Sequence, residues 1–341
     1  MTDPLVTVLM SVHNGERFLG ESLESLRIQT YRALEILVID DGSRDDTARI
    51  LREWPDERLR IVTQERSGLT RALGRGLREA RGELIARLDA DDVAHADRIA
   101  RQVAFLAHRA DVALCGTWAT VVSESGRVLE HARPPIEHEA ICAQLLWDNA
   151  FFHSSWCARA GVLRELGGYD ETIERAQDYE LATRIARAAG VANIPETLLR
   201  WRRSPRAISA VHRDAQRASV ARTSARELEL HVGTPLDSEW LARLRALWDG
   251  RADSLCSGDG VKLAMLVARL PRASGHTVLV ELVALVAAAL PLELPGLIVA
   301  TTRHWPAARR RLLAPKRVVR MVAGRPGLRI GRALRRGLRG Y

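Results

Sequence analysis

The feature that most constrains the fold is an alternation, over the first 130 residues, between short β-branched runs and segments with apolar residues at helical spacing. This alternation is typical of βαβ units, in which crossover helices join parallel strands. Strands are expected at residues 5–12, 35–39, 59–63 and 83–88, and helices at 18–29, 47–54 and 68–80. We therefore predict an α/β fold with a mostly parallel central sheet flanked by helices.

The pattern changes further along the chain. The elements expected there are a helix from about 95 to 108, strands at 112–122, 151–157 and 198–201, a return strand after Gly126, and helices after 137 and at 177–189. Beyond Pro205 the chain reads as largely helical, with amphipathic stretches at 214–230 and 238–247. The apolar segment 278–290 contains Glu281 and is followed by Pro291, so we expect a buried or interfacial helix there.

The positive charge is concentrated near the C-terminus. Thirteen Lys and Arg residues follow Glu293. Their thirteen positive charges exceed the net charge of the whole chain, +9, so the rest of the chain is net acidic. A polybasic tail favours an anionic partner, either nucleic acid or the cytoplasmic face of a membrane. Only Trp305 and Tyr341 are interleaved aromatics, which makes base stacking on nucleic acid a poor fit. We expect peripheral contact with an anionic membrane; a merely solvated tail is the alternative.

The cysteines and the N-terminus bear on the compartment. The four cysteines, Cys115, Cys142, Cys157 and Cys256, show neither CxxC nor zinc-like spacing, which predicts reduced thiols. The first residues lack the basic region and long apolar stretch of a secretory signal. We therefore expect a cytoplasmic protein.

Polar clusters follow three of the predicted strands. His13 and Asn14 come after the first strand, Asp40 and Asp41 after the second, and the run DADD at 89–92 after the fourth. In an open parallel sheet, ligands bind beyond the carboxyl ends of the strands, so these clusters should meet at one edge. Carboxylates gathered in one cleft repel one another unless a cation or hydrogen-bond donors neutralise them. A divalent ion held by one or two carboxylates and a substrate phosphate would do so.

The usual phosphate-binding loops are absent from the sequence. No lysine precedes Lys262, and neither GxxxxGK[ST] nor GxGxxG occurs at a strand-to-helix turn. A diphosphate could instead be held through a metal ion on Asp91, while Asp41 accepts a hydrogen bond from a base N–H. Together these residues predict a nucleotide-diphosphate site. Singly, each cluster also fits a structural role as a turn, a helix cap or, for Asp178, a helix N-terminal charge.

With these clusters in view, the sequence resembles glycosyltransferase family 2, whose members are inverting enzymes with a GT-A fold. The resemblance covers about residues 4–215. It rests on the segments VTVLMSVHNGE (6–16), ILVIDDGSRDDT (36–47), ARGELIARLDADD (80–92), LGGYD (166–170) and QDY (177–179). Ordered matches at family-like spacing make the resemblance specific.

The resemblance implies a role for each matching residue. The nucleotide-sugar donor would be bound by Ser11, His13, Asn14, Asp40, Asp41, Gly68, Asp89, Ala90 and Asp91. Asp41 would contact the base, Asp89 would lie near the ribose, and Asp91 would be the main protein ligand of Mg²⁺ or Mn²⁺. Asp178 corresponds to the catalytic base.

On the acceptor side, the resemblance implies roles for Gln177, His153 and Trp201. Packing within the core is the alternative interpretation for His153 and Trp201. Gln177 stands where the family has Glu, and Ser204 stands where the family frequently has His. These two departures bear on donor choice and metal affinity rather than on the reaction type.

We therefore expect a GT-A catalytic domain over residues 1–215, a helical extension over 216–302 and an Arg-rich basic tail over 303–341. The expected reaction transfers a sugar from a nucleotide-diphosphate sugar, expected to be a UDP-sugar, to a saccharide or lipid-linked acceptor in cell-surface polysaccharide or glycolipid synthesis. Two alternatives remain. One is a haloacid-dehalogenase-type phosphohydrolase with Asp89 as nucleophile and Asp91 as acid/base, and the other is a non-catalytic protein that binds through its basic tail.

Overall fold

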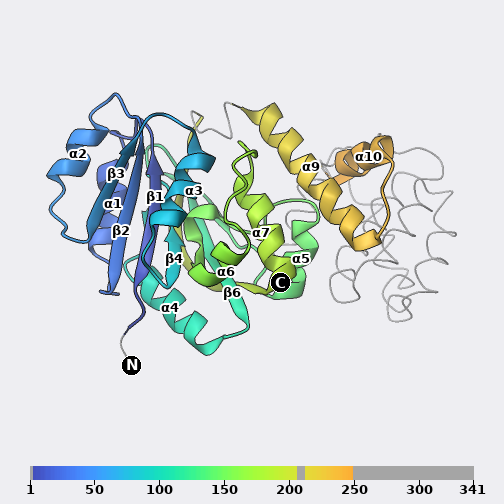
Figure 1. Cartoon of the computed structure of the whole chain (residues 1–341), viewed down its shortest axis with the longest axis horizontal. Helices are drawn as coiled ribbons and strands as arrows, with labels where there is room; N and C mark the ends of the chain where they lie inside the picture. Colours follow the sequence, from blue (N-terminus) through green and yellow to red (C-terminus); the bar gives the residue numbers. More distant parts are fainter. Residues whose placement is uncertain (1–2, 206–211, 249–341) are drawn as a thin grey trace. The chain divides into compact units, whose positions relative to one another are not determined.

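The protein is described here by a computed structural model that covers residues 3–205 and 212–248 (Figure 1). The chain divides into two units. The first comprises Met1–Ile141 and Asn149–Val220, and the second comprises Cys142–Asp148 and Ala221–Tyr341. The domain limits expected at residues 215 and 302 stay predictions. The apolar segment 278–290, Cys256 and the basic tail lie outside the described residues.

The first unit begins with four parallel strands in the order β3-β2-β1-β4. These strands and their connecting helices are β1 Val6–Val12, α1 Leu19–Arg27, β2 Leu34–Asp41, α2 Thr47–Glu53, β3 Leu59–Gln64, α3 Leu69–Glu79 and β4 Leu84–Arg87, close to the predicted ranges. Every residue of β1 and β2 is buried, as expected for strands covered on both faces. Right-handed crossovers place α1 and α2 on one face and α3 on the other, because the chain changes direction across the sheet after β3.

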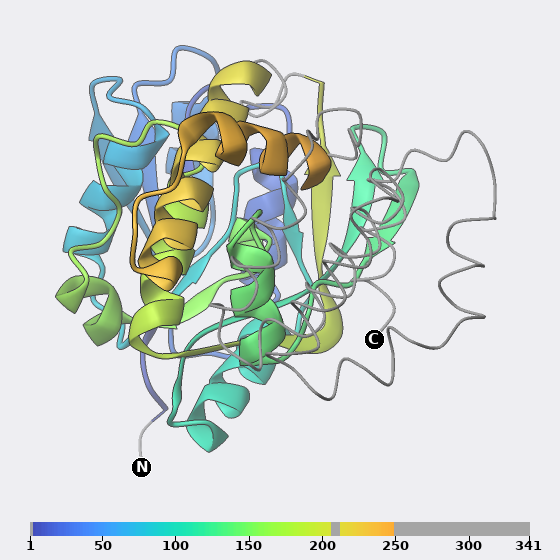
Figure 2. The same ribbon diagram turned by 90° about the vertical axis from the view of Figure 1, so that its right-hand side faces the viewer.

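The other half of the sheet is mixed. Strand β8 pairs antiparallel with both β4 and β6, and β6 runs parallel to β9, which carries β5 at its far edge. The bounds are β5 Val93–Ala94, β6 Val112–Ser123, β7 Val128–Ala132, β8 Cys157–Arg159 and β9 Gly190–Arg203. Figure 2 shows β9 (yellow-green) beside the hairpin of β6 and β7 (green). Strand β9 is longer than the predicted range 198–201. The prediction was too short because polar residues interrupt the apolar pattern of this strand.

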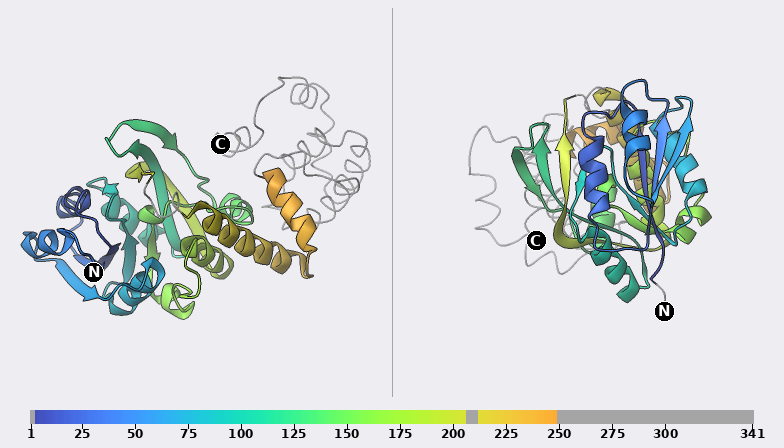
Figure 3. Two further views of the ribbon diagram at one scale, coloured as in Figure 1. Left: turned by 90° about the horizontal axis from the view of Figure 1, so that it is seen from above. Right: turned by 90° about the vertical axis from the view of Figure 1, so that its left-hand side faces the viewer.

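The remaining helices are α4 Arg98–His108, α5 His138–Leu145, the 3₁₀ helix η1 His153–Ser155, α6 Ala160–Glu165, α7 Gln177–Ala188, α9 Arg213–Val232 and α10 Ser238–Trp248. Figure 3 shows that helices of the first unit lie on both sides of its sheet. Helices α9 and α10 confirm the predicted helical character beyond Pro205. Within the described part of the chain, none of the helices combines the length and apolarity that a membrane crossing requires.

The strand predicted at 151–157 is wrong. The backbone N–H of Ser155 donates to Phe152 O, and that of Trp156 donates to His153 O, so the chain makes a tight turn here. Strand β8 begins only at Cys157. The apolar run that suggested a strand is explained instead by side-chain burial, since Phe151 and Trp156 pack edge to face.

Helix α3 packs closely on β1 at a glycine. A Cβ atom at Gly76 would overlap Leu9 Cδ1, and Leu9 is fully buried in the sheet. This contact holds α3 and the loop before it, which contains Gly68, against the carboxyl half of the sheet. In the described part of the chain, Cys115, Cys142 and Cys157 form no disulfide bond.

Candidate active site

The loops after β1 and β2 are joined by hydrogen bonds at the carboxyl edge of the sheet. Strands β1 and β2 run parallel in a register that pairs Val12 with Asp40. The backbone N–H of Asn14 donates to Ser43 Oγ at 3.0 Å, and the backbone N–H of Arg44 donates to Asn14 Oδ1 at 2.8 Å. Asn14 itself adopts a left-handed conformation with φ 52°. The structure thus brings the first two predicted clusters together.

Both ring nitrogens of His13 are engaged. Because Asp41 O can only accept, His13 Nδ1 must carry the proton and donate across 2.9 Å. Nε2 is then an acceptor, and Asn14 Nδ2 donates to it at 3.2 Å. The ring is held in one tautomer and one orientation next to the end of β2. Ser11, two residues before His13, is buried within β1.

Asp41 is a buried carboxylate that organises the loop between β3 and α3. Its Oδ1 accepts hydrogen bonds from Gln64 Nε2 and the Ser67 backbone N–H, each at 2.8 Å, and from Ser67 Oγ, while Oδ2 accepts from the Gly68 N–H at 2.8 Å. Burial acts to raise the pKa of Asp41, but these donors outweigh it and lower the pKa below its ordinary value. Asp40, also buried, accepts from the Ser43 N–H at 3.0 Å.

Asp89 lies just beyond β4 with both carboxylate oxygens occupied. Arg87 Nη2 donates to Oδ1, and Ser154 Oγ donates to Oδ2 at 2.8 Å. Burial acts to raise the pKa of Asp89. Several effects outweigh burial and lower the pKa below its ordinary value, and the largest of them is the positive charge of Arg87. A carboxylate whose two oxygens each accept a hydrogen bond from a protein side chain is poorly placed to attack phosphorus. This geometry disfavours the phosphohydrolase alternative.

Asp91 differs from Asp89 in having a free carboxylate. In the part of the chain that the structure describes, no other residue donates a hydrogen bond to it. Burial, followed by the charge of Asp89, raises the pKa of Asp91 to about 6. Its neighbour Asp92 is 1% exposed, and Asp92 Oδ2 has no hydrogen-bond partner among the described residues. Ala90, between Asp89 and Asp91 in the sequence, packs against the core.

These features fit a divalent cation on Asp91. Residues 3–205 and 212–248 contain no group of three or more His, Cys, Asp or Glu side chains placed to hold a metal. Mg²⁺ commonly takes one or two carboxylates and completes its shell with water and substrate phosphates. The Asp91 carboxylate accepts no hydrogen bond from another described residue, and its negative charge is disfavoured by burial and by Asp89. A divalent cation would neutralise that charge, so Asp91 is suited to be one of these carboxylate ligands.

Asp178 lies in the first turn of α7, in the same site as Asp89. Its Oδ2 accepts a hydrogen bond from Asn149 Nδ2 at 2.8 Å. Burial raises the pKa of Asp178 to about 6, and the charge of Asp89 adds to the effect although the Tyr179 backbone N–H opposes it. Asp89 and Asp178, 89 positions apart in the sequence, therefore lie close enough to interact electrostatically. Gln177, which precedes Asp178, is buried.

His153 belongs to an aromatic cluster with Trp156 and Tyr169, and Trp201 makes a separate aromatic contact. His153 Nε2 is 2.7 Å from the Tyr169 hydroxyl, and the His153 ring meets the Trp156 ring edge to face. Burial lowers the pKa of His153 to about 3, so the ring is neutral. Trp201 packs against Phe152 with ring centroids 5.6 Å apart. These contacts match the packing interpretation of both residues.

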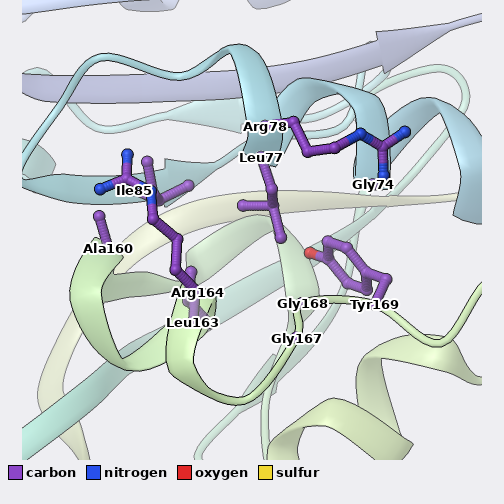
Figure 4. A pocket seen from close by; sticks show the side chains of 10 residues that line it. All are labelled: Gly74, Leu77, Arg78, Ile85, Ala160, Leu163, Arg164, Gly167, Gly168 and Tyr169. Carbon is purple, nitrogen blue, oxygen red and sulfur yellow. The ribbon is translucent and has the colours of Figure 1, made fainter.

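A separate pocket of about 310 Å³ lies between α3 and α6. Its lining is mostly apolar, with Arg78 and Arg164 at opposite ends (Figure 4). Figure 4 shows the side chains of Leu77, Ile85 and Leu163 between them. The pocket shares Tyr169 with the aromatic cluster. No sequence pattern had pointed to it.

Four residues of the site were missed by sequence reasoning, namely Arg87, Asn149, Ser154 and Tyr169. Arg87 could have been found from the sequence, because a charged residue within an otherwise apolar strand needs a buried partner. Tyr169 stood within the segment LGGYD without being assigned a role. Asn149 and Ser154 gave no signal, since their partners lie far away in the sequence.

Comparisons with known proteins identify related sequences. The family model described as Glycosyl transferase family 2 matches residues 7–167. An uncharacterized glycosyltransferase of Haemophilus influenzae is 28% identical over 241 residues, covering 67% of this chain and 75% of that protein. One of Methanocaldococcus jannaschii is 31% identical over 209 residues, covering 59% and 72%.

Two solved structures have a similar fold. TarS residues 1–349 of S. aureus, in complex with UDP, superposes with a TM-score of 0.56 at 17% identity, covering 90% of this chain and 92% of that one. The mannosyltransferase PcManGT of Pyrobaculum calidifontis, in complex with GDP-Man and Mn²⁺, gives a TM-score of 0.53 at 20% identity, covering 99% and 86%. These structures confirm the predicted fold class.

Proposed function

The chain belongs to glycosyl transferase family 2, and on that premise we propose that it transfers a sugar, with inversion, from a nucleotide-diphosphate sugar to an acceptor hydroxyl. The observation that supports this proposal is that Asp178 on α7 and Asp89, just beyond β4, lie close enough to interact electrostatically. A base for the acceptor and a site for the diphosphate must lie on opposite sides of one anomeric carbon. A carboxylate just beyond β4 and another on α7, close enough to interact, are compatible with that requirement.

The proposed chemistry uses each carboxylate differently. Asp178 takes the proton of the acceptor hydroxyl as the oxygen attacks the anomeric carbon. The bond between that carbon and the phosphate oxygen breaks, and its electron pair leaves with the nucleoside diphosphate. Attack from the face opposite the leaving group inverts the configuration. Mg²⁺ or Mn²⁺ bound at Asp91 would act as a Lewis acid toward the diphosphate.

The donor site is proposed to be built by the first three strand ends. The fixed ring of His13 offers a flat surface for a nucleobase, and Asp41 shapes the loop around it through Ser67 and Gly68. Solved neighbours were crystallised with UDP, UDP-GlcNAc and GDP-Man. We propose a UDP-sugar as donor and a saccharide or lipid-linked acceptor, in cell-surface polysaccharide or glycolipid synthesis.

The test is a panel of nucleotide sugars offered to the full chain. UDP- and GDP-sugars are incubated with and without Mn²⁺ or Mg²⁺, with a mixture of oligosaccharide and lipid-linked acceptors, and release of nucleoside diphosphate is measured. We expect release from one donor class only, dependent on the cation and absent in Asp178→Asn. Hydrolysis of a generic phosphate ester without any nucleotide release would instead support the phosphohydrolase alternative.

The basic tail is proposed to hold the enzyme beside an anionic membrane. Its thirteen Lys and Arg residues after Glu293 carry this proposal, since each basic residue near an anionic surface contributes about 1 kcal/mol. Removing residues 303–341 should release the protein from phosphatidylserine vesicles in a sedimentation assay. Binding that is unchanged by the truncation would reject the proposal.

A further inference from the structure

Beneath the site lies a buried cation that the proposed chemistry does not use. Arg87 ends β4, and its side chain is 2% exposed. Its Nη1 donates to the backbone oxygens of Leu88 and, at 3.5 Å, of Leu9, the residue that faces Arg87 on β1. Its Nη2 donates to Asp89 Oδ1. The guanidinium therefore bridges the middle of β1 and the residue after β4, and it also binds the Asp89 carboxylate.

A second buried arginine completes the support of Asp89. Arg98, fully buried at the start of α4, donates through Nη1 to Arg87 O at 2.9 Å and to Ser154 O. Ser154 Oγ in turn donates to Asp89 Oδ2. The end of β4 and the helix η1 are thus joined through Arg87, Arg98 and Ser154, and all three determine where the Asp89 carboxylate lies.

Stability alone does not explain a guanidinium at this position. In the described part of the chain, Arg87 Nε is buried without a hydrogen-bond partner. A buried charge is costly to desolvate, and an apolar side chain of similar volume often packs as well or better. What Arg87 supplies is a positive charge close to three carboxylates that otherwise repel one another.

The surroundings of Asp178 are sensitive to this charge. Asp178 is faced by Asp89 and Arg87 from the end of β4, by Tyr169 from the turn after α6 and by the amide of Asn149. Burial and then Asp89 raise the pKa of Asp178, whereas Arg87 lowers it. Arg87 therefore keeps more of Asp178 in the ionised form at neutral pH.

We infer that Arg87 is a positioning residue for the transfer reaction, because its guanidinium fixes Asp89 and offsets part of the negative charge shared by Asp89, Asp91 and Asp178. The inference rests on the proposed function. Without this cation Asp89 loses the donor that orients it, and the carboxylates repel each other more strongly. Donor placement and the ionisation of Asp178 both depend on one side chain that touches neither donor nor acceptor.

The test compares Arg87→Met with Arg87→Lys in the full chain. One readout does not depend on turnover: the titration of the Asp178 carboxyl, followed by ¹³C NMR and assigned with Asp178→Asn. We expect Arg87→Met to move its midpoint upward by at least about half a pH unit, and Arg87→Lys to leave it near wild type. The second readout is kcat/KM for the nucleotide sugar, which should fall about 100-fold in Arg87→Met and partly recover in Arg87→Lys.

The outcomes separate this inference from the proposed function. A folded Arg87→Met protein with an unchanged Asp178 titration, or with unchanged kcat/KM, would overturn the inference. If the wild-type chain turned over no nucleotide sugar yet the titration moved as expected, the proposed function would fail while the electrostatic role of Arg87 stood. Should Arg87→Met not fold, Asp89→Asn is compared with Asp89→Asn/Arg87→Met, in which neither partner of the Arg87–Asp89 ion pair is charged. The midpoint of the Asp178 titration must then be higher in Asp89→Asn/Arg87→Met than in Asp89→Asn.

Discussion

The side-chain amide of Asn149 donates a hydrogen bond to the Asp178 carboxylate across 2.8 Å. The same Asn149 accepts, through Oδ1, from the backbone N–H of Phe151 at 3.1 Å, which fixes which way the amide faces. The proposed catalytic base is therefore oriented by a residue 29 positions earlier, on the loop before η1. An acceptor hydroxyl can approach only the part of the Asp178 carboxylate that Asn149 leaves open.

Replacing Asn149 should weaken Asp178 as a base. A hydrogen bond to a charged group contributes about 1.5–3 kcal/mol, so we expect Asn149→Ala to lower kcat by about tenfold or more. The acidic limb of the pH–rate profile should move to higher pH, because the ionised carboxylate loses a donor. Asn149→Asp, which puts a second carboxylate beside Asp178, should move it further. Identical pH profiles in all three proteins would contradict this role for Asn149.

The pH dependence of transfer should follow Asp178. Burial raises its pKa to about 6, so the base form is present above that pH and is lost as the pH falls through it. We expect kcat to decline below pH 6 and Asp178→Asn to reduce it by about 10³-fold, within the range for loss of a general base. Nucleotide binding measured by calorimetry should remain near wild type. A variant that lost binding as well would place Asp178 in the donor site instead.

The same pKa predicts how Asp178→Asn affects stability. A carboxyl whose pKa is raised by folding favours the native state below its unfolded value, and this contribution is lost as the pH rises through about 6. At pH 8 the variant should therefore unfold at a temperature no lower than wild type. Thermal unfolding followed by circular dichroism at pH 5 and pH 8 checks the sign.

Asp91 should control the response to divalent cations. We expect Asp91→Ala to abolish metal-dependent turnover and to weaken Mn²⁺ binding measured by electron paramagnetic resonance. Chelation of the cation should inactivate the wild-type protein reversibly. Asp46→Asn is a matched control, because Asp46 is an exposed aspartate that pairs with Arg49 on α2. Equal Mn²⁺ binding by Asp91→Ala and Asp46→Asn would remove Asp91 from the proposed metal site.

Two glycine-to-alanine changes should have opposite effects. Alanine favours a helix over glycine by up to about 1 kcal/mol. At Gly20 in α1 a Cβ meets nothing within 4 Å, so Gly20→Ala should stabilise the protein. At Gly76 the Cβ overlaps buried Leu9, and overpacking of about 1–3 kcal/mol should outweigh the gain. Chemical denaturation of both variants measures the difference, and stabilisation by Gly76→Ala would show that α3 can move away from β1.

The first four strands could be predicted because each is a continuous apolar run. Val6–Val12 is buried on both faces, so its composition alone distinguishes it from a surface strand. The run FFHSSWC at 151–157 has a similar composition but forms a 3₁₀ turn, because its aromatic side chains pack around His153 and Trp156. Local apolarity reports burial, and it does not report which backbone conformation achieves that burial.

The chain's own pattern of strands and helices predicted that the acidic clusters follow β2 and β4. It therefore also predicted the edge of the sheet where they meet. The meeting of Asp178 with Asp89, the two hydrogen bonds that occupy Asp89, and the free carboxylate of Asp91 were decided only by the tertiary structure. The physical reason is range. Strand and helix periodicity act over a few residues, whereas the charge and hydrogen-bonding partners of Asp178 come from Asn149 and from the end of β4, which only the completed sheet brings to the same place.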